Sequence, residues 1–226
     1  MLLNRRGVML GGAAMGLMPK AALAAKVSAA QAPTEWHFDN LDRIGGHAVK
    51  VLGQPGLTTS PWGPAIVFDG AHDALLIDNH PLAGAKTFTF EAQFRPDGGA
   101  FAQRWFHLES ILDPAAAPGA STTRMLFELR VADGQWYLDA FATGPGYKQT
   151  LIVPGRRYPL GQWYHVAQSF DGQHYRSFVN GELQMETPLP FAPQGPGRCS
   201  VGARLNGVDH FHGAIRMARF SPYAAM

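Results

Sequence analysis

Hydrophobic and polar residues alternate along most of the chain after residue 34, with the period of two that is typical of β-strands. The alternation is strictest in residues 87–95, which place Phe88, Phe90, Ala92 and Phe94 on one face and polar side chains on the other. The same pattern predicts further strands at 101–111, 125–131, 136–141, 163–170, 174–179 and 182–185. Outside the first 25 residues no segment keeps a helical period for more than two turns, so the pattern predicts an all-β fold.

Dipeptides that favour tight turns separate several of these segments. Asp133-Gly134, Asp171-Gly172 and Asn180-Gly181 each stand between two expected strands, as in β-hairpins. Longer connections, rich in Gly, Pro, Ser and Thr, are expected at 53–64, 112–123 and 186–198. Many short strands joined by such turns are typical of a two-sheet antiparallel sandwich or jelly roll. We expect one domain of this kind over residues 35–226.

The first 25 residues have a different pattern, that of an export signal. Arg5 and Arg6 precede a mildly apolar stretch at 8–18, and Ala22-Leu23-Ala24 suits a cleavage site. Paired arginines before such a stretch resemble a twin-arginine signal, and a general secretory signal is the alternative. The stretch is shorter than the roughly 20 apolar residues that span a bilayer. We therefore expect a cleaved signal peptide at 1–25, a linker at 26–34, and a protein without a membrane anchor in the periplasm or outside the cell.

Composition narrows the possible partners. The net charge is +2, and Arg5, Arg6 and Lys20 supply three of the positive charges, so the chain after residue 25 is close to −1. No basic block remains to bind phosphates, which argues against nucleic acid as the main partner. Cys199 is the single cysteine and cannot form an internal disulfide, so we interpret it as a small residue of a strand.

Three segments together carry a resemblance to a known family. The first runs from Ala65 to Asp73 and is followed by the strand that begins at Thr87. The second joins Gly161–Ala167 to Phe170-Asp171-Gly172 and 178–181, and the third joins Val201-Gly202 to 211–220. Their order and spacing resemble the laminin-G-like jelly-roll domains of the concanavalin A-like lectin/glucanase superfamily, over about residues 35–223. The resemblance implies a concanavalin A-like, two-sheet antiparallel jelly-roll sandwich.

The resemblance also has implications for partners and metals. Members are usually binding modules, often for glycans and often attached to enzymes, and many hold a calcium ion at the rim of the sandwich. Asp69 and Asp73 fall in the matching loop and are the candidate calcium ligands. A structural turn at Asp69-Gly70 is the alternative, because two carboxylates supply few of the six or more oxygens that calcium prefers.

Polar residues on the expected strands provide candidates for glycan binding. If these strands are neighbours, their polar faces form one grid that could hydrogen-bond sugar hydroxyls, with aromatic rings that could stack on sugar faces. The candidate ligand-binding residues are Glu91, Gln93, Arg95, Gln103, Trp105, Trp136 and Tyr137. The alternative is the solvated face of a half-exposed sheet.

A carbohydrate-active enzyme is the alternative to a binding protein. The candidate catalytic residues are His107, Glu109, Glu128 and Arg130. A retaining glycosidase needs two carboxyl groups about 5–5.5 Å apart, for which Glu109 could pair with Glu91 or Glu128. A polysaccharide lyase could instead use His107 as the base and Arg130 to stabilise the uronate anion, with Gln93 and with Tyr147 or Tyr164 as the proton donor.

We therefore expect an exported protein that recognises a poly- or oligosaccharide. The first alternative is a polysaccharide lyase or glycoside hydrolase of the same fold. The second is a protein-interaction module, a role that laminin-G-like domains also serve. An enzyme would depend on the candidate catalytic residues, a glycan-binding protein on exposed aromatic rings, and a protein-binding module on an apolar patch.

Overall fold

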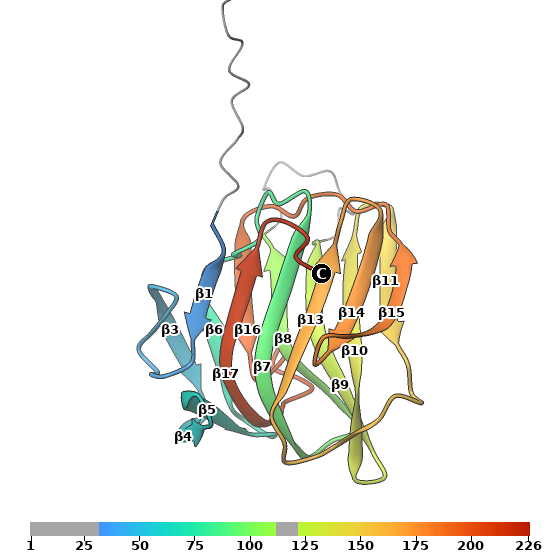
Figure 1. Cartoon of the computed structure of the whole chain (residues 1–226). Coiled ribbons are helices and arrows are strands. Elements are labelled where there is room, and N and C mark those ends of the chain that lie inside the picture. The colour runs from blue at the N-terminus through green and yellow to red at the C-terminus, as the bar shows by residue number, and fades with distance from the viewer. Residues whose placement is uncertain (1–31, 112–121) are drawn as a thin grey trace, which may run out of the picture.

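The predicted alternation is present as seventeen β-strands in two antiparallel sheets that pack face to face (Figure 1). This computed structural model describes residues 32–111 and 122–226. The expected signal peptide, most of the expected linker and most of the expected loop at 112–123 lie outside the described residues. Within the described residues, no helix is long and apolar enough to cross a membrane.

The first sheet contains eight strands, and the last long strand of the chain lies near its centre. In spatial order they are β15 (Glu182–Pro188), β14 (His174–Val179), β13 (Tyr164–Phe170), β7 (Phe88–Gly98), β17 (His212–Ser221), β5 (Gly63–Asp69) and β4 (Gly56–Ser60). The eighth strand, β1 (Thr34–His37), pairs with the second half of β17.

The second sheet contains nine strands and carries the site described below. In spatial order they are β11 (Tyr147–Ile152), β10 (Gln135–Gly144), β9 (Arg124–Ala132), β8 (Ala102–Ser110), β16 (Gly197–Val201), β6 (Ala74–Ile77), β3 (His47–Leu52) and β2 (Arg43–Ile44). The ninth strand, β12 (Tyr158–Pro159), pairs with β10.

The three predicted hairpins are confirmed. Asp133 and Gly134 join β9 to β10 with positive φ angles of 54° and 71°, and Asn180 and Gly181 join β14 to β15 at 49° and 81°. These are the backbone conformations that a two-residue hairpin requires, and Asn, Asp and Gly adopt them most readily. The expected loop at 53–64 is wrong in part, because β4 lies within it and pairs with β5 at the edge of the first sheet.

Aromatic rings fill the space between the sheets. The Trp105 ring is stacked between those of Phe94, at 4.4 Å between centroids, and Phe127, at 5.1 Å. Trp36 and Trp136 are also fully buried. Cys199 is fully buried on β16, as its interpretation as a strand residue requires. Large rings at this interface join strands that lie far apart in the sequence and so fix how the two sheets pack.

A β-bulge in β8 changes which side chains face outward. The pairing register with β9 shifts between Arg104 and Phe106, so Trp105 is an extra residue without a partner on β9. Trp105 and Phe106 consequently both point into the core, whereas Arg104 lies opposite Glu128 on the outer face. A bulge of this kind re-aims the side chains on either side of it.

Candidate ligand-binding site

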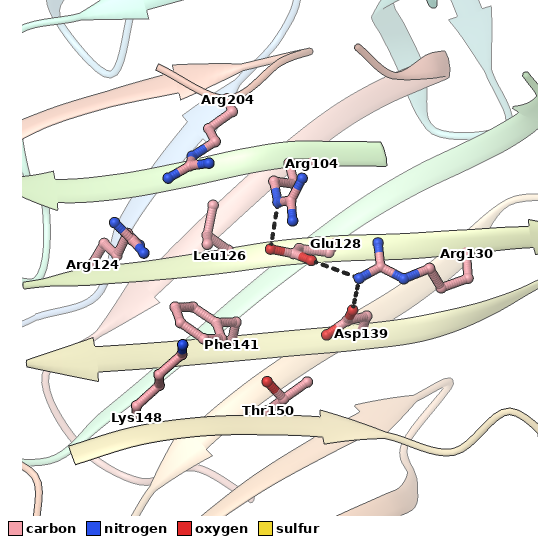
Figure 2. A pocket seen from close by; sticks show the side chains of 10 residues that line it. All are labelled: Arg104, Arg124, Leu126, Glu128, Arg130, Asp139, Phe141, Lys148, Thr150 and Arg204. Atoms are coloured by element: carbon pink, nitrogen blue, oxygen red, sulfur yellow. Dashed lines mark hydrogen bonds and ion pairs between the residues drawn. The ribbon is translucent and has the colours of Figure 1, made fainter. Parts of the chain in front are cut away.

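The outer face of the second sheet has a hollow of about 250 Å³ over strands β8 to β11. Figure 2 shows its lining, which combines five cationic side chains with two carboxylates and a small apolar floor. The lining residues are Arg104, Arg124, Leu126, Glu128, Arg130, Asp139, Phe141, Lys148, Thr150 and Arg204. All but Arg204, which follows β16, come from four neighbouring strands.

Strand alternation places these side chains together. On β9 the even-numbered residues 124–130 face the hollow, whereas Met125, Phe127 and Leu129 belong to the core. The pairing register then aligns the strands in rows. Leu126 lies opposite Phe141, which lies opposite Thr150, so that an apolar floor of Leu126 and Phe141 crosses β9 and β10 and ends at Thr150 on β11. Next to it, Glu128 is flanked by Arg104 and Asp139.

Ion pairs join one side of the hollow into a continuous chain (Figure 2). Arg104 donates from Nε to Glu128 Oε1 at 2.8 Å, and Arg130 Nη2 lies 3.2 Å from Glu128 Oε2 and 2.6 Å from Asp139 Oδ2. The same Arg104 also contacts Asp209 at the rim. Because each charge is held by at least one partner, these side chains have fixed positions before any ligand arrives.

Asp139 is the least solvated carboxyl group in the hollow. It is 1% exposed, and burial raises its pKa to about 7, with a further increase from the neighbouring charge of Glu128. The Arg130 and Arg104 charges oppose this increase but do not cancel it. Near neutral pH this carboxyl therefore exchanges a proton, which ordinary aspartates do not.

The other side of the hollow carries cations that the ion-pair chain does not reach. Among the described residues, no carboxylate lies within 4.0 Å of the charged nitrogens of Arg124, Lys148 or Arg204. The Arg124 guanidinium lies 5.6 Å from the centroid of the Phe141 ring. Glu109 on β8 lies opposite Arg124 on β9, but the Glu109 carboxylate oxygens are directed elsewhere. One lies 3.6 Å from His107 Nε2 and the other 3.6 Å from Arg198 Nη2.

Of the four predicted catalytic residues, Glu128 and Arg130 line the hollow and His107 and Glu109 do not. His107 is 1% exposed, and its Nδ1 accepts a hydrogen bond from the backbone N–H of Leu205 at 3.2 Å. Burial, with the charges of Arg204 and other nearby arginines, lowers the pKa of His107 to about 3. Such a weak and enclosed base does not suit the predicted proton abstraction.

The condition for a single grid of polar side chains is not met, because β7 lies in the first sheet and β8 and β9 lie in the second. The predicted pairing of Glu91 with Glu109 fails for the same reason. Each β7 candidate instead has a local partner. Glu91 lies 3.0 Å from His165 Nε2, Gln93 accepts a hydrogen bond from Arg216 at 2.9 Å, and Arg95 makes two hydrogen bonds to Asp97.

Burial rules out most of the predicted stacking residues. Trp105 and Trp136 are fully buried in the core, and Gln103 is buried with its amide bonded to the Gly98 and Ala100 carbonyls. Tyr137, only 7% exposed, lies opposite Arg130 on β10, next to the hollow.

The two predicted proton donors also have structural partners. The Tyr164 hydroxyl donates to the Pro159 carbonyl at 2.7 Å, and Tyr147 is buried with its hydroxyl 3.4 Å from the Ala192 carbonyl. Neither lines the hollow.

The two candidate calcium ligands hold backbone together. Asp69 Oδ1 accepts the N–H groups of residues 71, 72 and 73, and this hydrogen bonding lowers the pKa of its carboxyl. Asp73 accepts the N–H of Gln54 at 2.7 Å and that of Asp69 at 3.0 Å. In the described part of the chain, no third His, Cys, Asp or Glu joins them in a metal-ligating group. The oxygens therefore suit a structural turn, and calcium stays a prediction.

Comparison with known proteins identifies the fold family. Residues 69–225 match the model of a family in the concanavalin A-like lectin/glucanases superfamily. No curated protein matches the chain.

Several solved structures share the fold. Domain 4 of AbnA, an extracellular arabinanase from Geobacillus stearothermophilus solved with arabinotriose, has a TM-score of 0.61 at 18% identity, covering 85% of this chain and 93% of that one. A Trypanosoma rangeli sialidase mutant has a TM-score of 0.56 at 11% identity, covering 86% of this chain and 31% of that one. The binding domain of botulinum neurotoxin DC in complex with SialylT has a TM-score of 0.55 at 10% identity, covering 87% of this chain and 49% of that one. At these identities the likeness shows the fold alone.

Proposed function

The chain belongs to the concanavalin A-like lectin/glucanases superfamily, and from that premise we propose that it binds a saccharide in the hollow on its second sheet. The observation that carries the proposal is the composition of the hollow. Hydrogen-bonding groups, of which those on one side are fixed by ion pairs, surround an apolar floor of Leu126 and Phe141. A sugar ring presents the same combination, since it has hydroxyl groups at its edge and C–H groups on its faces.

Two of the similar structures support this ligand class. The arabinanase domain was solved with arabinotriose, and the neurotoxin domain was solved with SialylT. These ligands belong to those proteins, and the fold is what this chain has in common with them. The hollow supplies the independent argument that a saccharide fits here.

A second candidate function is catalysis on a saccharide, and Asp139 is the observation that favours it. A carboxyl group with a pKa raised to about 7 can donate a proton near neutral pH, and Glu128 is its direct neighbour. Two carboxyl groups, one holding a proton and the other ionised, are what glycoside hydrolysis requires. We rank binding first because Arg130 contacts both carboxylates and so holds them in ion pairs.

We further propose that the protein acts in the periplasm or outside the cell. The support is the leader pattern of residues 1–25, with Arg5 and Arg6 before a mildly apolar stretch. Poly- and oligosaccharides of cell envelopes and of the surroundings would meet the hollow there.

A binding panel with a matched pair of variants tests the site. Thr150 is exposed and lines the hollow, so Thr150→Trp fills the space without entering the core. Thr59 is an exposed threonine on edge strand β4 of the other sheet, so Thr59→Trp is the control. We expect retention on at least one immobilised polysaccharide, lost in Thr150→Trp and kept in Thr59→Trp. Retention that is equal in both variants would place the saccharide elsewhere.

A further inference from the structure

The charges of the hollow are unevenly distributed. Five cations and two carboxylates line it, whereas the chain as a whole after residue 25 is close to −1. The positive charge is therefore local and is not a property of the whole surface. Both carboxylates, Glu128 and Asp139, are bound by Arg104 and Arg130, which leaves the positive excess on the opposite side.

We propose that the saccharide is anionic and that its carboxylate or sulfate group binds between Arg124, Lys148 and Arg204, an inference that rests on the proposed function. Figure 2 shows these three side chains on the same side of the hollow, around Leu126 and Phe141, away from the ion-pair chain. An acid group there completes the ion pairs that the described residues of the protein leave open.

The hydrogen-bonding state of Arg124 points to the same place. Its Nε is buried and has no hydrogen-bond partner among the residues that the structure describes. A guanidinium presents donors in a planar fork that matches a carboxylate or a sulfate, and such charge-assisted bonds are stronger than neutral ones. Lys148 extends from β11, so the three cations reach the site from three separate segments.

The pKa values of two groups, Arg124 and His107, are lowered by burial and by the unneutralised positive charge. Burial and then the charge of Arg204 lower the pKa of Arg124, although Glu109 and Glu128 oppose the change. Burial and then the charges of Arg204 and Arg124 lower the pKa of His107 on the neighbouring strand. Like charges that repel one another in this way are stabilised by a bound anion.

The apolar floor favours a sugar acid over an inorganic anion. Phe141 and Leu126 lie next to Arg124, and a pyranose ring laid on them would direct its acid group towards the cations. The hydroxyl groups of the same ring would face the fixed carboxylates on the other side, which accept hydrogen bonds. An acidic polysaccharide therefore fits both halves of the hollow.

The test compares saccharides that differ only in their acid group. The probes are trigalacturonate and its methyl ester, sialyllactose and its methyl ester, and dextran sulfate and dextran, each titrated calorimetrically into the full chain. We expect the acidic member of at least one pair to bind about tenfold more tightly than its neutral partner, with an affinity that falls as salt is added. The pair that shows this distinguishes a carboxylate ligand from a sulfate ligand.

Lys148→Met locates the acid group. Lys148 is exposed, so its loss should leave the fold intact, and Lys50→Met on distant strand β3 is the control. We expect about a tenfold loss of affinity for the acidic probe in Lys148→Met and no loss in Lys50→Met. If the acidic and neutral members of every pair bind with equal affinity, this inference is wrong and the proposed function still stands. The same holds if Lys148→Met and Lys50→Met bind the acidic probe with equal affinity.

Two further outcomes are informative. If no member of any pair binds, the proposed function itself fails, and this inference fails with it. If a single-stranded oligonucleotide binds Lys148-dependently and more tightly than every acidic saccharide, the hollow serves a different class of polyanion and the inference is wrong.

Discussion

Glu128 and Asp139 lie directly opposite each other on β9 and β10, and one nitrogen of Arg130 contacts both carboxylates, at 3.2 Å and 2.6 Å. Two like charges on adjacent strands destabilise a sheet unless a cation separates them. The pair is therefore an arrangement that depends on Arg130, and it divides the hollow into an acidic side that is already paired and a basic side that is not.

Removing Arg130 should destabilise the protein strongly. Arg130→Met leaves the buried Asp139 beside Glu128 without its ion-pair partner, while Glu128 keeps only Arg104, and we expect the free energy of unfolding to fall by about 3 kcal/mol. Urea unfolding measures the loss. The control is Arg157→Met, because Arg157 pairs with the exposed Asp133 and should contribute less than about 1 kcal/mol. Equal losses in the two variants would contradict the role given to Arg130.

Asp139 should make stability fall as pH rises. Its pKa is about 7 in the folded protein and near the ordinary 3.8 in the unfolded chain, so between pH 4 and 7 the folded state holds a proton that the unfolded state has lost. The free energy of unfolding should therefore decrease over this window, by up to about 1.4 kcal/mol per pH unit, and level off above pH 7. Asp139→Asn removes this contribution. If the free energy of unfolding changes with pH in the same way for the wild type and for Asp139→Asn between pH 4 and 7, the predicted contribution of Asp139 is wrong.

His107 should have the opposite effect. Its pKa falls from the ordinary 6.5 to about 3, so below pH 6.5 the unfolded chain takes up a proton that the folded protein refuses. Stability is lost as pH falls from 6.5 towards 3, and His107→Gln should flatten that part of the curve while its amide oxygen still accepts the Leu205 N–H. Since the effects of Asp139 and His107 partly cancel, the differences between wild type and each variant are the quantities to measure. An unchanged slope in His107→Gln would show that His107 is accessible and protonated.

The turn at Asp73 should contribute to stability through two backbone hydrogen bonds. Asp73→Ala leaves the N–H groups of Gln54 and Asp69 without their acceptor, and we expect a loss of about 2 kcal/mol in thermal or urea unfolding. Asp78→Ala is a control, because no hydrogen bond is assigned to that side chain among the described residues. A loss below about 0.5 kcal/mol would contradict the structural role of Asp73. Thermal unfolding of the wild type with added calcium and with a chelator tests the predicted calcium site, since a bound ion raises the melting temperature.

Sequence alternation predicts most of the strands and two of the ten residues that line the hollow, and the reason can be followed on β9. There the period of two holds without interruption, so Glu128 and Arg130 are correctly placed on one face, opposite Phe127 and Leu129. The same alternation, extended by one residue at the start of this segment, also places Arg124 on the outer face, and within the predicted strand 136–141 it gives Asp139 and Phe141 one common face.

The remaining errors come from features that alternation does not encode. The β8 bulge at Trp105 puts two consecutive residues into the core, so Arg104 was missed and Trp105 was assigned to the surface. Consecutive strands β7 and β8 belong to opposite sheets, which separates Glu91 from Glu109. Arg204 reaches the hollow from the segment after β16, through a pairing of strands about 95 residues apart in sequence that only the folded chain shows.

The central claim is that a saccharide binds on the outer face of the second sheet, and amide chemical-shift mapping tests it most directly. The protein would be titrated with the saccharide that the panel identifies, and the perturbed backbone amides assigned. The account predicts that the largest shifts lie in β9, β10 and β11, around Leu126, Phe141 and Thr150. Shifts concentrated on β7 and β13 of the first sheet, or none at saturating saccharide, would contradict it.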